Sequence, residues 1–125
     1  MSIEMPADVI QRQLNAYNSK DVEGWLGTYA HDAEQYSLHG ERLAQGHAEM
    51  RSRITSRFLE PDLHAKLVSR TVMNNIVVDL EIITRNFQDG LGTVEMLCIY
   101  EVIDGLIQKA SFAIPLCQTT CRVTF

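Results

Sequence analysis

The 125-residue chain lacks several features that would assign it to a particular class of protein. No run approaches the roughly 20 apolar residues that a membrane-spanning helix needs, and no basic N-terminal segment leads into an apolar one as in a secretory signal. Positive charge is scarce: 11 Lys and Arg face 16 Asp and Glu, giving a formal net charge of −5. Because nucleic-acid binding needs concentrated Lys and Arg, we expect a cytoplasmic protein with no membrane or nucleic-acid partner.

Cysteine and metal-binding motifs are also sparse. The three cysteines, Cys98, Cys117 and Cys121, cannot all pair within one chain, so a reduced environment is the default. Cys117 and Cys121 could form a disulfide or bind metal, but no second ligand pair lies near them. The four histidines show neither H-x-H nor H-E-x-x-H spacing, and the glycines form no phosphate-binding or dinucleotide fingerprint. We therefore expect no metal and no cofactor.

Two long β-forming runs organise the chain, residues 76–87 (IVVDLEIITRNF) and 93–102 (TVEMLCIYEV). The segment between them contains Asp89-Gly90, which tolerates positive φ angles and favours a tight turn. If Gln88 pairs with Leu91, partner residues have numbers that sum to 179. The pattern predicts an antiparallel hairpin at the centre of a curved sheet.

Side chains alternate across a strand, so each face of this hairpin has its own set of residues. One face collects Val77, Asp79, Glu81, Ile83, Val94, Met96, Cys98, Tyr100 and Val102. The other collects Val78, Leu80, Ile82, Thr84, Glu95, Leu97, Ile99 and Glu101, of which Val78, Leu80, Ile82, Leu97 and Ile99 are apolar. This second set is too apolar for long exposure, which predicts a homodimer formed through the outer sheet face.

The remaining segments predict a single α+β domain that covers residues 1–125. In chain order, the expected elements are helices at 6–17 and 22–31, a strand at 34–38, a turn at 39–42, a helix at 46–59, and strands at 64–73, 76–87, 93–102 and 106–114. Helices segregated on one face of an antiparallel sheet are typical of the α+β class. A strongly bent sheet on three N-terminal helices forms a cone with an apolar cavity inside.

Two segments carry a resemblance to a known group of proteins: NSKDVEGWLGTYAHDA (18–33) and GHAEMRSRI (46–54). They resemble the nuclear transport factor 2-like superfamily, in particular its SnoaL-like and ketosteroid-isomerase-like branches. The resemblance covers nearly the whole chain and implies a cystatin-like roll, sheet-to-sheet dimers and steroid- or polyketide-like ligands. These motifs mark a fold that hosts many unrelated functions.

The resemblance also places the residues of ketosteroid isomerases on positions of this chain. Their carboxylate base falls on Ser37, their tyrosine donor on Gln13, and their protonated carboxylic donor on Cys98. Serine cannot act as a carboxylate base and a thiol is a poor donor, so the substitutions disfavour standard ketosteroid isomerisation. The same comparison puts the Cys98 face of the hairpin on the pocket side.

Asp79, Glu81 and Tyr100 are the candidate catalytic residues. The two acids stand two apart on one strand, so their side chains point the same way, and Tyr100 lies opposite Asp79 in the expected register. Two carboxyl groups desolvated in an apolar cone repel each other, which raises at least one pKa toward neutrality, as a general acid/base requires. The alternative is that both acids lie in water or pair with Arg85 or Lys109.

The candidate substrate-binding residues are mostly aromatic: Tyr17, Trp25, Tyr29, Tyr36, His39, Phe58, Met96 and Cys98. Core packing is the alternative for most of the aromatics. Trp25 and Tyr29 are the stronger pocket candidates, because their polar tips need a partner when buried. His39 is a candidate base at the cone mouth or a solvated turn residue. Arg51, Arg53 and Arg57 are expected on a solvated helix surface.

Two functions fit this pattern. The first is an enzyme of the isomerase, cyclase or hydratase type, close to steroid Δ-isomerases or polyketide cyclases, that moves protons on a hydrophobic small molecule. The second is a non-catalytic dimeric ligand-binding or association module. A buried carboxyl group with a raised pKa distinguishes the first from the second.

Overall fold

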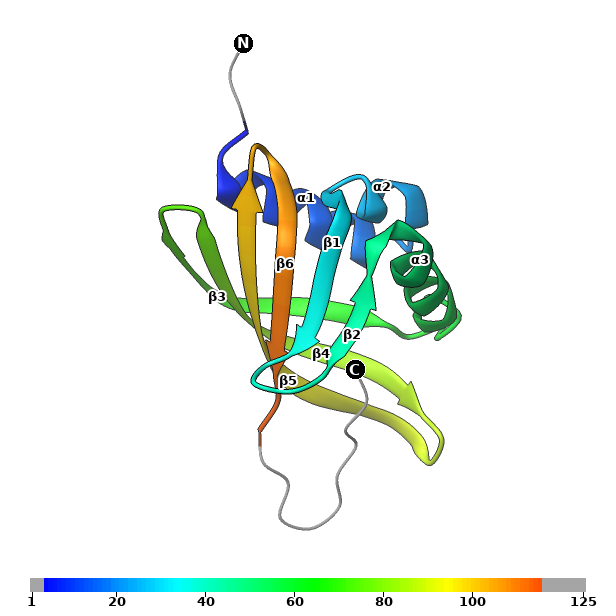
Figure 1. Ribbon diagram of the computed structural model, residues 1–125. Coiled ribbons are helices and arrows are strands. Elements are labelled where there is room, and N and C mark those ends of the chain that lie inside the picture. The colour runs from blue at the N-terminus through cyan, green and yellow to red at the C-terminus, as the bar shows by residue number, and fades with distance from the viewer. Residues whose placement is uncertain (1–3, 116–125) are drawn as a thin grey trace.

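The computed structural model describes residues 4–115, which form three helices and a six-stranded sheet (Figure 1). In chain order the elements are α1 (Pro6–Asn18), α2 (Val22–Leu26), β1 (Tyr29–Ser37), β2 (Arg42–Gln45), α3 (Gly46–Arg57), β3 (His64–Met73), β4 (Ile76–Phe87), β5 (Gly90–Ile103) and β6 (Leu106–Ala113). The strand order is β2-β1-β6-β5-β4-β3. The predicted α+β class and curved sheet are confirmed.

The β4–β5 hairpin lies at the centre of the sheet in a register different from the predicted one. Phe87 pairs with Gly90, so the loop consists of two residues and partner numbers sum to 177 rather than 179. Asp79 therefore faces Cys98, not Tyr100, and Glu81 faces Met96. The predicted register is wrong by two residues, because the turn closes earlier than expected. An error of two residues preserves the alternation of side chains, so the predicted faces stay the same.

Residues 22–45 depart most from the expected elements. Helix α2 ends at Leu26, and Tyr29 begins a strand instead of lying within the helix expected over residues 22–31. The chain turns at Thr28, whose carbonyl accepts a hydrogen bond from the Ile107 backbone N–H at 2.8 Å. Strand β1 consequently pairs with β6 in parallel, an arrangement that the sequence reading did not foresee. The segment after the turn at His39 forms strand β2 on the edge of the sheet.

The helices pack together on one side of the bent sheet (Figure 1). Helix α1 contacts α2 and strands β3 to β6, and α3 contacts α2, β1 and β2. Irregular pairing at Gln35/Tyr36, Leu67/Ser69 and Glu101/Val102 bends the strands, as bulges do. Alternate residues of β4 face the helices and are buried: Val77, Asp79, Glu81, Ile83 and Arg85. The concave face thus carries charged groups as well as apolar ones.

No helix within residues 4–115 is long and apolar enough to cross a membrane. Cys117 and Cys121, whose pairing or metal binding stayed open above, lie outside the described residues.

Candidate functional site

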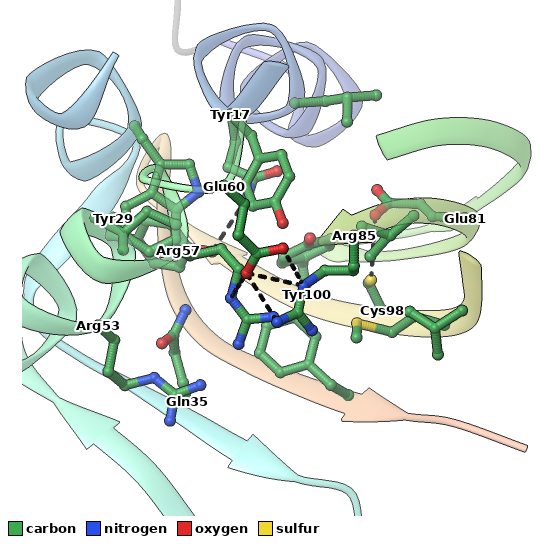
Figure 2. Close-up of a pocket in the computed structure, with 18 of the residues that line it drawn as sticks. Tyr17, Tyr29, Gln35, Arg53, Arg57, Glu60, Glu81, Arg85, Cys98 and Tyr100 are labelled. Atoms are coloured by element: carbon green, nitrogen blue, oxygen red, sulfur yellow. Dashed lines mark hydrogen bonds and ion pairs between the residues drawn. The ribbon is translucent and has the colours of Figure 1, made fainter. Parts of the chain in front are cut away.

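A cavity of about 380 Å³ lies between the helices and the concave face of the sheet. Its walls come from all three helices and from strands β1, β4, β5 and β6. Figure 2 shows polar side chains from opposite walls converging on it. Apolar side chains such as Leu14, Ile54, Ile83, Val94 and Met96 make up much of the remaining lining. The cavity therefore suits a mainly apolar small molecule with a few polar groups.

Glu81 is the buried acid of this cavity. It projects from β4 and is 4% exposed. Burial, followed by the negative charge of Asp79, raises the pKa of Glu81 from 4.5 to about 7. The Cys98 thiol donates a weak hydrogen bond to Glu81 Oε1 at 3.7 Å. A carboxyl group with this pKa can accept or donate a proton near neutral pH.

Asp79 has a different role, although it lies two residues away on the same strand. It is fully buried and accepts two hydrogen bonds from Arg70, Nε to Oδ1 at 2.7 Å and Nη2 to Oδ2 at 2.8 Å. Arg70 is its direct cross-strand partner on β3 and also donates to Gln11. Asp79 is not part of the cavity lining. Its pairing with Arg70 differs from both sequence alternatives, which named water, Arg85 or Lys109.

Tyr100 and Cys98 line the cavity from β5, on the same face of the sheet as Glu81. Tyr100 is 2% exposed, and burial raises its pKa well above 10. Burial and the nearby Glu81 likewise raise the pKa of the Cys98 thiol. Both groups therefore stay protonated near neutral pH. The Tyr100 hydroxyl is the stronger of the two hydrogen-bond donors.

Trp25, Tyr29 and Tyr17 form an aromatic wall of the cavity. The Trp25 and Tyr29 rings lie 4.7 Å apart between centroids. Gln13 Nε2 donates to the Tyr29 hydroxyl at 3.5 Å. The indole Nε1–H of Trp25 is buried and has no hydrogen-bond partner in the described part of the chain. A buried donor without an acceptor is costly, so a ligand acceptor at this atom would be favourable.

Three arginines and Glu60 form a charged cluster in the lining (Figure 2). Glu60 accepts hydrogen bonds from Arg85 at 2.8 to 3.1 Å and from the Asn86 backbone N–H at 2.9 Å. Arg57 Nε lies 3.8 Å from the same carboxylate. Arg53 contributes from one turn earlier on α3. The predicted solvated surface is therefore wrong for Arg53 and Arg57, while Arg51 is exposed and pairs with Glu23.

A family model described as a SnoaL-like domain matches residues 10–110. The chain belongs to the SnoaL-like family. The comparison with curated proteins gave no match. The matched stretch runs from α1 into β6 and contains every residue that lines the cavity except Phe112.

Solved structures similar to this SnoaL-like protein share its fold at low sequence identity. A cystatin-fold protein from Novosphingobium aromaticivorans has a TM-score of 0.82 and 18% identity, over 87% of this chain and 97% of that chain. A ketosteroid isomerase-like protein from Kribbella flavida has a TM-score of 0.77 and 15% identity, over 94% and 83%. TerC, co-crystallised with polyporic acid, has a TM-score of 0.76 and 14% identity, over 88% and 91%. Identities this low support the fold alone.

The SnoaL-like protein brings together seven of the eleven candidate site residues. The cavity is lined by Glu81, Tyr100, Tyr17, Trp25, Tyr29, Met96 and Cys98. Besides Asp79, the lining omits Tyr36, His39 and Phe58. Tyr36 donates to Glu34 and stacks under Lys109, His39 is exposed in the turn after β1, and Phe58 packs edge-on against Tyr17. These three were misplaced because the short strand and the end of α3 face other directions than expected.

Of the three positions that the resemblance to ketosteroid isomerases picks out, two line the cavity and one does not. Gln13 and Cys98 line the cavity of the SnoaL-like protein, whereas Ser37 does not. Gln35, on the same strand, lines it instead. Within residues 4–115, no three His, Cys, Asp or Glu side chains gather in an arrangement that could hold a metal ion.

Proposed function

We propose that this SnoaL-like protein is an enzyme that moves a proton on a hydrophobic small molecule bound in the cavity. Glu81 serves as the general acid/base and Tyr100 as the hydrogen-bond donor. The observation that carries the proposal is the 4%-exposed Glu81 carboxyl, with a pKa of about 7, in the wall of the 380 Å³ cavity. A carboxyl group in a cleft whose pKa is perturbed by burial and by a specific charge is a candidate catalytic group.

The proposed reaction begins with a carbonyl compound whose acidic C–H lies against Glu81. The ionised carboxylate accepts the proton from carbon, and the electron pair moves onto the carbonyl oxygen to form an enolate. Tyr100 donates a hydrogen bond to that oxygen, and its raised pKa keeps the hydroxyl protonated. Glu81 then returns the proton to another carbon, which is an isomerisation. Alternatively, the enolate carbon attacks a second carbonyl and the alkoxide formed there takes the proton from Glu81, which is a cyclisation. A general base of this kind increases the reaction rate by about 10²- to 10⁴-fold.

Asp79 acts on this chemistry without touching the substrate. Its charge raises the pKa of Glu81, and its two hydrogen bonds with Arg70 hold it in place. Of the three catalytic residues predicted from the sequence, the proposal keeps Glu81 and Tyr100 and makes Asp79 a positioning residue.

Relatives of the same fold support a steroid- or polyketide-like ligand. The Kribbella flavida protein is ketosteroid isomerase-like, and TerC was crystallised with polyporic acid. The resemblance to ketosteroid isomerases implies that Gln13 and Cys98 stand at their donor positions and Ser37 at the position of their base. The proposed mechanism therefore uses a base at a different position on the same cavity.

The test uses 2-tetralone, an apolar cyclic ketone with acidic C–H bonds, in D₂O at pD 7.5. Proton NMR follows the loss of the C–H signal next to the carbonyl. The native protein should exchange these protons faster than buffer does. Glu81→Gln should lose roughly 10²-fold or more of this rate enhancement. Glu41→Gln, at an exposed position in the turn between β1 and β2, should retain it. Binding without exchange would identify a ligand-binding module instead of an enzyme.

We also propose a homodimer formed through the outer sheet face. Val78, Leu80, Ile82, Leu97 and Ile99 are only half-buried within one chain. Covering them with a second copy removes apolar area from water. Sedimentation should find a dimer at micromolar concentration and a monomer for Leu80→Glu. A native monomer would refute this assembly.

A further inference from the structure

The arginines of the cavity carry more positive charge than the neighbouring carboxylate balances. The Arg57 side chain is 18% exposed, and within residues 4–115 its single carboxylate neighbour inside 4.0 Å is Glu60, at 3.8 Å. The Glu60 oxygens already accept two parallel hydrogen bonds from Arg85 and one from the Asn86 backbone. Arg57 makes no side-chain hydrogen bond to any described residue, so its guanidinium has donors to spare.

Arg53 adds a second guanidinium to the same wall. It stands four residues before Arg57 on α3, which places both on one face of the helix. Its contact is a long one, Nη1 to the Leu43 carbonyl at 3.5 Å, and no carboxylate of residues 4–115 lies within 4.0 Å of it. Burial lowers the pKa of Arg53 and of Arg57, as expected for cations held out of water without a full counter-charge.

The unpartnered donor of Trp25 is an independent sign of a missing acceptor. Its indole N–H is buried, and Trp25 belongs to the same cavity lining as the two arginines. Guanidinium groups bind carboxylates and other oxyanions through paired hydrogen bonds. An acceptor-rich ligand would therefore satisfy groups that the described chain leaves without partners.

We propose that the cavity binds an apolar molecule bearing an anionic oxygen group, most simply a carboxylate, which Arg57 and Arg53 hold. This assignment of ligand class builds on the proposed function and makes the substrate an apolar keto acid. Figure 2 shows Arg53 and Arg57 on the other side of the view from Glu81 and Cys98. The anionic group then lies away from the acid/base, where repulsion with the Glu81 carboxylate is least.

Two matched probes test the charge requirement on the native protein. 1-Naphthoate and its uncharged amide, 1-naphthamide, share one ring system and differ in charge. Calorimetric titration at pH 6 should give at least about tenfold tighter binding of the naphthoate, a factor that corresponds to about 1.4 kcal/mol. The chain has one tryptophan, so the single indole N–H peak in a ¹H–¹⁵N spectrum should shift when either probe enters the cavity.

Variants on α3 locate the anion. Arg57→Gln and Arg53→Gln should each remove most of the preference for naphthoate and leave naphthamide binding unchanged. Arg51→Gln is the matched control, because Arg51 is on the same helix but exposed and paired with Glu23. Arg57→Lys keeps the positive charge but loses the planar guanidinium that can donate two parallel hydrogen bonds. Its preference for naphthoate should therefore lie between those of the native protein and Arg57→Gln.

The outcomes separate this inference from the proposed function. Equal affinity for both probes in the native protein, or an unchanged preference in both glutamine variants, overturns the anion site. Glu81→Gln should keep the naphthoate preference while losing proton exchange on 2-tetralone. If exchange fails and the preference holds, the acid/base proposal falls and the anion site stands.

Discussion

Replacing Glu81 by glutamine gives a quantitative test of the buried carboxyl. Its pKa is about 7, raised first by burial and then by Asp79, against 4.5 in an unfolded chain. The folded protein therefore binds this proton more tightly than the unfolded chain. Its contribution to the free energy of unfolding is complete below pH 4.5 and is lost as the pH rises through about 7. At about 1.4 kcal/mol per pH unit, the loss amounts to roughly 3 kcal/mol.

Urea unfolding between pH 4.5 and 8, followed by Trp25 fluorescence, measures this loss. Trp25 is 4% exposed in the folded protein, so unfolding changes its environment strongly. As the pH rises from 4.5 to 8, the free energy of unfolding of Glu81→Gln should increase by roughly 3 kcal/mol relative to that of the native protein. The difference isolates Glu81 because all other titrating groups are shared. Glu41→Gln, in the exposed turn between β1 and β2, controls for the loss of a solvated glutamate. A native-minus-Glu81→Gln difference that stays constant over the range would refute the reasoning.

Four further changes have defined outcomes. Asp79→Asn removes the like charge beside Glu81, so an NMR titration should give Glu81 a pKa below 7. Arg70→Leu leaves Asp79 buried without its partner and should cost about 3 to 5 kcal/mol in the free energy of urea unfolding. Asp21→Ala removes the side chain that accepts from the Gly24 N–H at the start of α2, with an expected loss of about 1 kcal/mol in the same assay. Tyr100→Phe should slow 2-tetralone exchange about tenfold or more, since a donor to the enolate oxygen is lost, with probe binding by calorimetry as the control.

Much of the fold could be predicted because local signals and packing agree. The runs on either side of Asn74-Asn75 predict β3 and β4 at their observed positions, and alternation within β4 places Glu81 on the buried face. That placement survived a wrong register, since a shift of two residues leaves each side chain on its own face. Tyr29 was misassigned because its spacing from Val22, Trp25 and Leu26 fits a helix equally well.

The charged parts of the site depend on how distant segments meet. Glu60 and Arg85 lie 25 residues apart, and their contact requires the loop after α3 to dock on β4. The sequence around each residue does not predict that contact. For the same reason, Arg53 and Arg57 were predicted to lie on a solvated helix surface. The Arg70–Asp79 pair did carry a signal. A two-residue turn at Asn74-Asn75 pairs residues whose numbers sum to 149, which places Arg70 opposite Asp79.

The parallel contact between β1 and β6 ties the early part of the chain to its late part. Tyr29 pairs with Ile107, and Ser37 pairs with Phe112. A nascent polypeptide that ends before Leu106 leaves β1 with an open, unpaired edge, which is a known hazard for aggregation. Loop closure over so long a stretch is slow. During synthesis, therefore, the cavity wall that bears Tyr29 and Gln35 can close only after β6 has emerged from the ribosome, long after β1 itself has been made.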